Sequence, residues 1–352
     1  MGSRRIRVAL SAAWVVAFVG AWLTMGFTTD RFTVVFWIVT ALVAFTWGTR
    51  PWWQAPLDWL PIIAFFVVYD YTRGLAMRIG LPVGWTWPSE VDRVLAFGHL
   101  PSAWLQGRLA QPHDAVPWWE AIVATVYLSH FIVPFVLGAV LWVRSRPVFT
   151  AYMVRLALVS AIGVVAYVLV PTAPPWAAAR CTVTEVAAHP SSPACMDRYV
   201  PSDPEHTVIG PLTRHHEGYR PVVQRITTRG WDLVPGMHRT RGFIQSGIDG
   251  SNPVAAVPSL HAAGAMLVAA FLWCRVRRRW RPLLAAYPLA MGFSLVYGGD
   301  HYLTDVLLGW LAVAVVMVAA GWVDRRRSAR GSPTGRIADA NESAGRPRQL
   351  TS

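Results

Sequence analysis

The stretch "YGGDHYLTDVLLGW", residues 297–310, places two aspartates and a histidine at the start of a strongly apolar run. His301 and Asp305 are four residues apart, and residues at this spacing share one face of a helix. Asp305 is therefore positioned to accept a hydrogen bond from one ring nitrogen of His301, which fixes the tautomer and leaves the other nitrogen as a nucleophile. The same stretch also fits a water-facing turn, including Asp300, that leads into a membrane helix.

The composition of the chain favours a membrane protein. Its 352 residues are 54% hydrophobic and include 19 Trp, whereas only 14% are charged, and the mean hydropathy is +0.37. A soluble protein carries about 25% charged residues. The formal net charge of +13 would by itself indicate a nucleic-acid partner. Because the arginines flank the apolar runs, orientation in a bilayer explains the charge better, and we expect no nucleic-acid partner.

Eight apolar segments predict an all-α polytopic membrane protein. Several approach the ~20 residues that cross a hydrocarbon core of about 30 Å, although the second and seventh are short. The first segment follows "RRIR" and lacks a small-residue cleavage site, so we expect a retained anchor rather than a signal peptide. The predicted spans are 8–28, 32–48, 57–73, 118–143, 149–171, 257–273, 282–297 and 302–323.

The arginines also predict the topology. The stretches "GSRRIR", "GTRPWWQ", "VRSRP", "CRVRRRWRP" and "DRRRSAR" follow at alternate ends of the predicted spans. Under the positive-inside rule all five are cytoplasmic, so both termini are inside and segments 74–117, 172–256 and 298–301 face outward. This places the opening motif at the external face of the plasma membrane.

The chain divides into three predicted regions. We expect two accessory transmembrane helices in residues 1–50, a six-helix core in residues 51–323, and a disordered cytoplasmic tail in the polar residues 324–352. Inside the core, segment 172–256 is long, polar and proline-rich, which predicts a small external cap. The stretch "SEVDRVLAFGHL", residues 89–100, predicts an interfacial amphipathic helix.

The three cysteines fit this topology. Cys181 and Cys195 both lie in the outward segment, where the compartment is oxidising, so we predict a disulfide between them. The alternative is two unpaired thiols. Cys274 lies at the cytoplasmic end of a predicted span.

A second histidine belongs to the same predicted face. The stretch "NPVAAVPSLHAAGA", residues 252–265, opens the sixth predicted span and contains His261. Pro258 suits a first helical turn, Ser259 is a capping residue type, and a helix start attracts phosphate through its free N–H groups. Because the sixth span runs inward and the seventh returns, His261 and His301 are expected at one face. A polar anchor at the membrane interface is the alternative for a single histidine.

These two motifs together resemble the type 2 phosphatidic acid phosphatase superfamily, whose later signatures are PSGH and SRxxxxxHxxxD. Leu260 stands in place of the signature Gly, and Leu295 in place of the signature Arg. The signature KxxxxxxRP is absent in its usual form because the chain contains no Lys, and "RHHEGYRP", residues 214–221, is one residue short of it. The residues that match are Pro258, Ser259, His261, Ser294, His301 and Asp305.

Within the superfamily, "PSLH" and "HYxxD" are similar to the branch of inositol-phosphorylceramide synthase and sphingomyelin synthase, in which an aromatic residue such as Tyr302 follows the histidine. The stretches "PTAPPWAA", residues 171–178, and "NPVAAVPSLHAA" look typical of bacterial members. The resemblance covers roughly residues 51–323 and implies that this six-helix core has the fold of the superfamily.

The resemblance implies a phosphohistidine mechanism. His301 attacks the phosphorus of a lipid phosphate or phosphodiester, Asp305 orients His301, and His261 protonates the departing oxygen and then activates the acceptor. We expect no metal or other cofactor, since cationic side chains and helix-start N–H groups stabilise phosphoryl oxygens. His215 and His216 lack a convincing set of further ligands for zinc.

Other side chains must replace the missing phosphate ligands, and Arg is chemically adequate because its planar fork suits phosphate. Asp70 and Arg73 form either a functional or a purely structural ion pair within a span. His130 lies mid-span and either faces substrate or is a buried, hydrogen-bonded histidine. The candidates for substrate or phosphate binding are Ser259, Asp70, Arg73, His130, Arg220, Arg239 and Arg241.

The leading functional hypothesis is a membrane phosphotransferase that moves a phosphoalcohol head group, in the manner of inositol-phosphorylceramide synthase. Its partners would be a phospholipid or polyprenyl phosphate donor and a polyol or lipid-hydroxyl acceptor. With water as acceptor, the same site would be a lipid phosphate or polyprenyl diphosphate phosphatase. A non-catalytic lipid-binding protein or transporter is the further alternative, against which the presence of His261, His301 and Asp305 argues.

Overall fold

The computed structural model describes most of the chain, and over these residues the protein is mostly helical. Arg73, Arg239, Arg241 and the predicted tail from residue 332 onward lie outside the described residues, and the side chains of Asp70 and Arg220 do so too. The described residues are 2–25, 30–72, 75, 79–111, 115–191, 193–196, 206–211, 213–215, 218–234, 237 and 254–331.

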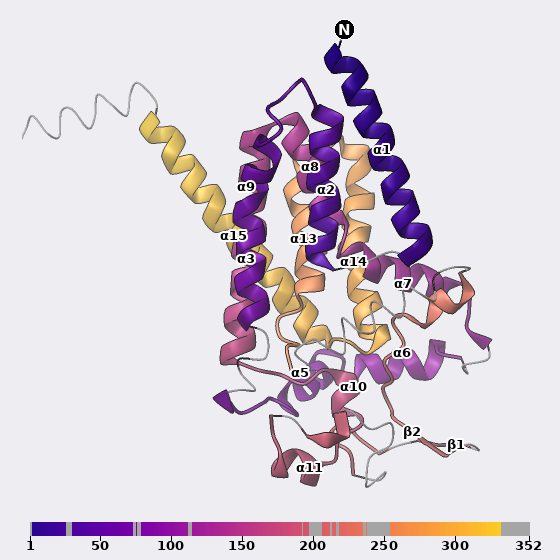
Figure 1. The fold of residues 1–352 in the computed structure, drawn as a ribbon. Helices are drawn as coiled ribbons and strands as arrows, with labels where there is room; N and C mark the ends of the chain where they lie inside the picture. The colour runs from indigo at the N-terminus through magenta and orange to yellow at the C-terminus, as the bar shows by residue number, and fades with distance from the viewer. Residues whose placement is uncertain are drawn as a thin grey trace, which may run out of the picture.

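The longer helices form an elongated bundle (Figure 1). The eight predicted spans overlap these helices in order, with the fourth span falling on two helices, α7 and α8. The bundle helices are α1 (Gly2–Met25), α2 (Arg31–Thr46), α3 (Gln54–Thr72), α7 (Trp119–Ser129), α8 (Val133–Arg144), α9 (Arg146–Leu169), α13 (Leu260–Trp273), α14 (Arg281–Gly298) and α15 (Leu303–Gly331).

The apolar helices indicate a membrane protein. By length and composition, three segments of the described chain are able to cross a membrane: Ser3–Thr24, Arg146–Leu169 and Leu303–Arg326. Helices α7 and α8 meet at a bend of 52° and add a fourth if the pair forms one span. Because α2, α3 and α13 include shorter apolar segments, the arrangement of six core and two accessory spans remains a prediction.

Helix α13 is central, since it packs against α8, α9, α14 and α15. Its first turns carry the small, buried run from Ala262 to Ala265, and small residues allow neighbouring helices to approach closely. The start of α13 lies close to α15, where a Cβ atom added at Gly309 would lie 2.5 Å from the carbonyl oxygen of the cap residue Ser259. Glycine at this position therefore permits α15 to lie directly against the start of α13.

A cap of shorter elements covers the bundle at the end away from the N-terminus (Figure 1). It contains one two-stranded antiparallel hairpin, in which β1 pairs with β2. The elements at this end are α5 (Trp87–Leu95), α6 (Pro101–Leu109), α10 (Pro175–Ala178), α11 (Val183–Ala188), η2 (Ala194–Met196), β1 (Thr213–His215), β2 (Gly218–Arg220) and η3 (Arg229–Leu233). The turn η4 (Arg278–Trp280) joins α13 to α14.

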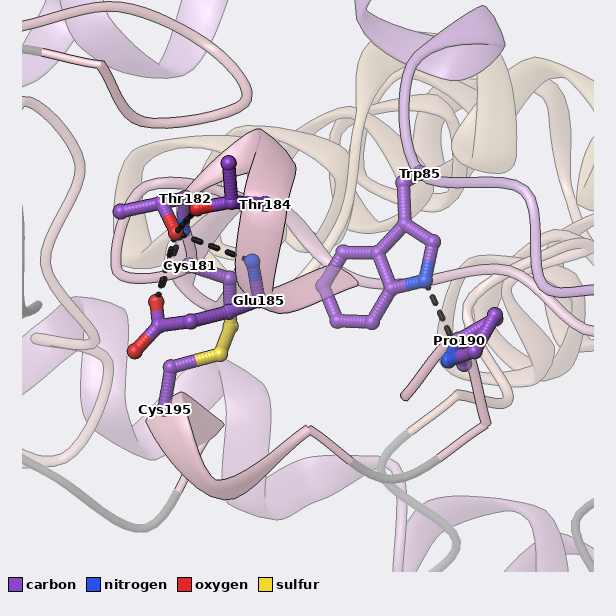
Figure 2. Close-up of a disulfide and its surroundings, with 7 residues drawn as sticks. All are labelled: Trp85, Cys181, Thr182, Thr184, Glu185, Pro190 and Cys195. Atoms are coloured by element: carbon purple, nitrogen blue, oxygen red, sulfur yellow. Dashed lines mark hydrogen bonds between the residues drawn. A yellow bond between two sulfur atoms is a disulfide. The ribbon is translucent and has the colours of Figure 1, made fainter. Parts of the chain in front are cut away.

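A disulfide between Cys181 and Cys195 lies in the core of the cap (Figure 2). Both sulfurs are buried in a cluster that also contains Tyr302, the residue after His301. Thr182 and Glu185 form a capping box at the start of α11, so the chain next to Cys181 is held locally as well. The cap therefore has an apolar core of its own, and the turn before α15 is part of it.

Buried polar contacts join the cap to the bundle. Arg229 of η3 forms a bidentate ion pair with Glu120 of α7, and the hydroxyl of Tyr297 also donates to this carboxylate. Both members of the pair are almost fully buried, which is tolerated because the charges are paired and hydrogen-bonded. Gln106 of α6 adds a hydrogen bond of 2.7 Å to the carbonyl of Tyr297. These contacts fix the cap over the ends of α7 and α14.

Candidate active site

His301 lies in the turn between α14 and α15. Helix α14 is terminated by Gly299, which adopts φ +78°, a conformation that glycine reaches without steric cost. Helix α15 begins at Leu303, so His301 precedes the helix rather than lying in it. Its Nδ1 is nevertheless 3.2 Å from Oδ2 of Asp305, and the two side chains are buried.

The carboxylate of Asp305 orients both the imidazole and the turn. Oδ2 faces Nδ1 of His301 and accepts the backbone N–H of Tyr302 at 2.9 Å. Because a carboxylate is an acceptor, the contact favours the tautomer with the ring proton on Nδ1, which leaves the lone pair of Nε2 free. The imidazole of His301 is thus held in one orientation, with the negative charge of Asp305 next to the nitrogen opposite Nε2.

His261 lies in the first turn of α13. Ser259 caps this helix, since its Oγ accepts the N–H of Ala262 at 3.3 Å, and its own N–H donates to the carbonyl of Asp305 at 2.9 Å. This backbone hydrogen bond joins the starts of α13 and α15. As a result, the ring centroids of His261 and His301 are 5.6 Å apart. The structure thus brings the two histidines and Asp305 together.

Aromatic rings surround His261. Tyr127 stacks on its ring with a centroid distance of 5.0 Å, and Phe131 meets it edge-on at 5.7 Å. His130, at the bend between α7 and α8, is closest, with ring centroids 4.4 Å apart. Nδ1 of His130 and Nε2 of His261 are buried without a hydrogen-bond partner among the described residues. His130 is therefore a neighbour of the candidate acid–base residue.

Arg225 brings positive charge to the turn before His301. Its Nε donates to Oδ1 of Asp300 at 2.7 Å, and the hydroxyl of Thr227 donates to the other carboxylate oxygen. The guanidinium lies 5.3 Å from the ring centre of Trp176, and its charge acts on His261. The sequence analysis did not select Arg225, because no spacing relates it to either histidine motif.

Asp92 on α5 holds the start of α15 from outside the bundle. Its carboxylate accepts the N–H groups of Leu303 and Thr304, at 2.9 and 2.8 Å, and the hydroxyl of Thr304 at 2.6 Å. Burial raises the pKa of the Asp92 carboxyl above its ordinary value, while these hydrogen bonds act in the opposite direction. A carboxylate is favoured at a helix N-terminus, so Asp92 acts as a distant cap two residues beyond His301.

Helix α2 contributes a further cation. The guanidinium of Arg31 lies 4.2 Å from the ring centre of Tyr69, and its charge acts on His130 and His261. Arg31 begins α2, one of the two helices predicted as accessories, and its positive charge acts on both histidines.

The remaining predicted candidates divide by position. Asp70 lies near the end of α3, and Arg220 ends β2, but the structure describes only their backbones. Arg73, Arg239 and Arg241 fall outside its described ranges. Within those ranges, no group of three or more His, Cys, Asp or Glu side chains is arranged to hold a metal ion.

Comparison with known proteins identifies the family. The chain matches the PAP2 superfamily over residues 86–320, about two thirds of its length, and this interval contains His261, His301 and Asp305. No curated protein and no solved structure matches the chain. Members of this superfamily are usually phosphatases or phosphotransferases, and an enzymatic role on lipid phosphates is consistent with the site. The chain belongs to the PAP2 superfamily.

Proposed function

We propose that the protein is a membrane phosphotransferase that acts on phospholipid head groups through a phosphohistidine at His301. The observation that carries this proposal is the contact of 3.2 Å between Nδ1 of His301 and Oδ2 of Asp305, with His261 beside them. Membership of the PAP2 superfamily supports phosphatase or phosphotransferase chemistry in general. The transfer of a phosphoalcohol, as in inositol-phosphorylceramide synthase, is the finer proposal.

In the first step, Nε2 of His301 attacks the phosphorus of the donor lipid. A P–N bond forms, the P–O bond to the leaving alcohol breaks, and His261 gives its proton to that oxygen. The imidazole of His301 gains positive charge as the P–N bond forms. The Asp305 carboxylate on the opposite nitrogen stabilises this charge, as expected for a base-oriented nucleophile.

In the second step, the neutral His261 accepts the proton of the incoming hydroxyl. The acceptor oxygen attacks phosphorus, the P–N bond breaks, and His301 is regenerated. Water as acceptor gives a phosphatase, whereas a polyol or lipid hydroxyl gives a transferase. The 5.6 Å between the two ring centroids supports both imidazoles reaching the same phosphoryl group.

Positive charge near the histidines supports stabilisation of the phosphoryl oxygens. Arg225 has its Nε engaged by Asp300, which directs a planar guanidinium toward the turn that carries His301. Arg31 adds charge from α2. Arg is suited to phosphate because its donors form a rigid fork. In this proposal these two residues take the role that lysine and arginine signatures have in the family, and Arg73, Arg220, Arg239 and Arg241 remain further candidates.

The proposed site faces outward. The five Arg-rich stretches all lie at or beyond helix ends away from the cap, which supports a cytoplasmic location for that end and for both termini. The disulfide in the cap supports an oxidising compartment at the opposite end. We therefore place His261 and His301 at the external face of the plasma membrane.

A transfer assay separates the two enzymatic outcomes. Purified protein in vesicles is incubated with phospholipid labelled with ³²P in its head group, with and without inositol. A transferase is expected to make a labelled inositol phosphate ester whose formation depends on the added inositol. Release of labelled free phosphate from a monoester lipid, or of labelled phosphoalcohol from a diester lipid, at the same rate without inositol would establish the phosphatase instead. Protein that gives neither product, and no labelled enzyme, would be a non-catalytic lipid-binding protein.

A further inference from the structure

The turn between α5 and α6 exposes large apolar side chains at the cap end of the molecule. Val94 is 80% exposed and Phe97 is 95% exposed, and Leu95 between them is exposed as well. Val94 and Leu95 end α5, and Phe97 lies in the turn before α6. Both short helices lie at the end of the bundle, outside its long helices (Figure 1). Contact with lipid tails along a span therefore does not account for their exposure.

Helix α5 buries two polar side chains, Ser89 and Asp92. It exposes the apolar Val94 and Leu95 beside the charged Glu90 and Arg93, as an amphipathic helix at a membrane interface does. The three hydrogen bonds from the start of α15 to Asp92 determine this orientation. Since the buried carboxylate cannot turn outward without losing them, the apolar face must remain outward.

The backbone at Phe97 adds a second observation. Its φ is +54°, a value that side chains bulkier than Asn or Asp rarely adopt, and Gly98 follows at +90°. The conformation lifts the phenyl ring away from the protein surface, where its side chain remains almost fully accessible. The N–H of Gly98 donates to the carbonyl of Arg93 at 2.6 Å, so Phe97 ends α5 in a left-handed helix cap that presents its ring outward.

The neighbouring surface identifies that contact as lipid. Helix α6 exposes Trp104, and the guanidinium of Arg108 lies 4.1 Å from its ring centre. Aromatic and Arg side chains together are typical of the head-group level of a bilayer. Helices α5 and α6 pack against α15 and α14, whose own outer faces expose Leu311 and Phe293. The apolar turn thus lies between two short helices that pack against helices of the bundle.

We propose that the α5–α6 turn inserts Val94, Leu95 and Phe97 into the boundary between head groups and acyl chains of the outer leaflet. Insertion of an amphipathic element reaches about 5–10 Å into this boundary. Through Asp92, the same helix holds the start of α15, so the anchor sets the depth of the His301 turn relative to the head groups. The membrane contact does not depend on the proposed reaction.

Depth-dependent quenching tests the anchor. In a Cys274→Ser background, Phe97→Cys is labelled with a bimane maleimide, and the protein is reconstituted into phosphatidylcholine vesicles that carry nitroxide at a shallow or a deep acyl position. The shallow nitroxide is expected to quench the label more strongly than soluble iodide does. The control is Val183→Cys on α11, which is 60% exposed and lies in the cap; iodide is expected to quench it, and lipid nitroxide is not.

A second labelling position guards against an effect of losing the phenyl ring. Val94→Cys keeps Phe97 and is expected to show the same preference for the shallow nitroxide. Quenching of both positions by iodide and not by lipid would overturn the proposal. So would a cross-link between positions 97 of two copies without lipid quenching, which would assign the surface to a second copy of the chain. Neither readout requires catalytic activity, so failure of the proposed function leaves the test intact.

Discussion

The starts of α13 and α15 lie side by side, but they are held in different ways. Helix α13 is capped by its own Ser259, and His261 in its first turn is packed among the rings of Tyr127, Phe131 and His130. Helix α15 is capped by Asp92 from a distant helix, and His301 before it faces a carboxylate. One imidazole is held by ring packing and the other by charge.

This difference supports two different roles. A nucleophile that becomes positively charged on forming a P–N bond needs a negative partner, and Asp305 provides one for His301. A group that gives and takes a proton in successive steps must avoid being fixed in one charge state. Among the described residues, Nε2 of His261 has no hydrogen-bond partner, so no carboxylate fixes a charge at that nitrogen. The comparison therefore fits the proposed mechanism, in which His301 is the nucleophile and His261 transfers the proton.

The largest effect is expected from His301→Gln. Loss of the nucleophile should abolish the phosphoenzyme and lower turnover by more than about 10⁴-fold, as for other covalent nucleophiles. The measurement is trapping of ³²P on the protein, with the acid-labile and base-stable behaviour of a phosphohistidine. His189→Gln, at an exposed histidine of the cap, is the matched control. If His301→Gln still trapped ³²P, His301 would not be the nucleophile, and the proposed difference in role between His301 and His261 would be wrong.

Asp305→Asn should follow, because it preserves the shape of the side chain but removes its charge. Neutralising a carboxylate that orients a catalytic imidazole lowers turnover by roughly 10³–10⁴-fold. The expected defect is slow formation of the phosphoenzyme, measured in a single turnover, rather than weak binding of substrate. Unchanged kinetics would show that the contact with His301 is structural only.

His261→Gln sharpens the comparison through its dependence on the leaving group. We expect a loss of about 10²-fold with an alkyl phosphodiester, which must be protonated as it departs, and a much smaller loss with a nitrophenyl ester. The ratio of the two rates measures proton donation directly. An equal loss with both substrates would instead assign His261 a role in orienting His301.

Removing the disulfide with Cys181→Ser and Cys195→Ser should act unequally on the two starts. The bond closes a loop with a sequence separation of 14, and its loss is expected to cost about 2–3 kcal/mol of cap stability. Tyr302 is packed in the same cluster as the two cysteines, whereas no residue of α13 belongs to it. Hydrogen exchange should therefore accelerate more in residues 299–305 than in 259–263, with Cys274→Ser as the control.

The smallest effects are expected from the two caps. Ser259→Ala and Asp92→Ala should each cost about 1–2 kcal/mol of stability, measured by thermal unfolding in detergent. Because Asp92 accepts three hydrogen bonds and Ser259 accepts one, the second substitution should be the more damaging. The reverse order would mean that α15 is held mainly by the bundle and not by α5.

The sequence predicted the helical segments and the pairing of the histidine motifs, but not the bend in the fourth span or the position of His301 before α15. The predicted spans overlap the bundle helices because apolar runs between Arg-rich turns carry a strong signal. The fourth span is bent at His130, where α7 ends and Pro134 occupies the first turn of α8, and packing against α13 determines that geometry. The position of His301 before α15 follows from the glycine cap of α14 rather than from helical spacing.

The surrounding charges were not predictable in the same way. Asp92 contacts Leu303 across 211 residues, and Arg225 contacts Asp300 across 75. Such pairs arise only when the cap folds back over the bundle, so neither periodicity nor local spacing marks them. Arg31 is similar, because its place beside the histidines depends on how α2 packs against α3 and α8.

The absence of a side chain at Gly309 affects the distance between His261 and His301. At that position the backbone of α15 lies directly against the carbonyl oxygen of Ser259, so main-chain contact helps to set the distance between the rings of His261 and His301. Packed main chain is nearly incompressible, whereas side chains relax by small rotations. A methyl group introduced there would act as a wedge, moving the two histidines apart while every chemical group of the proposed site was still present.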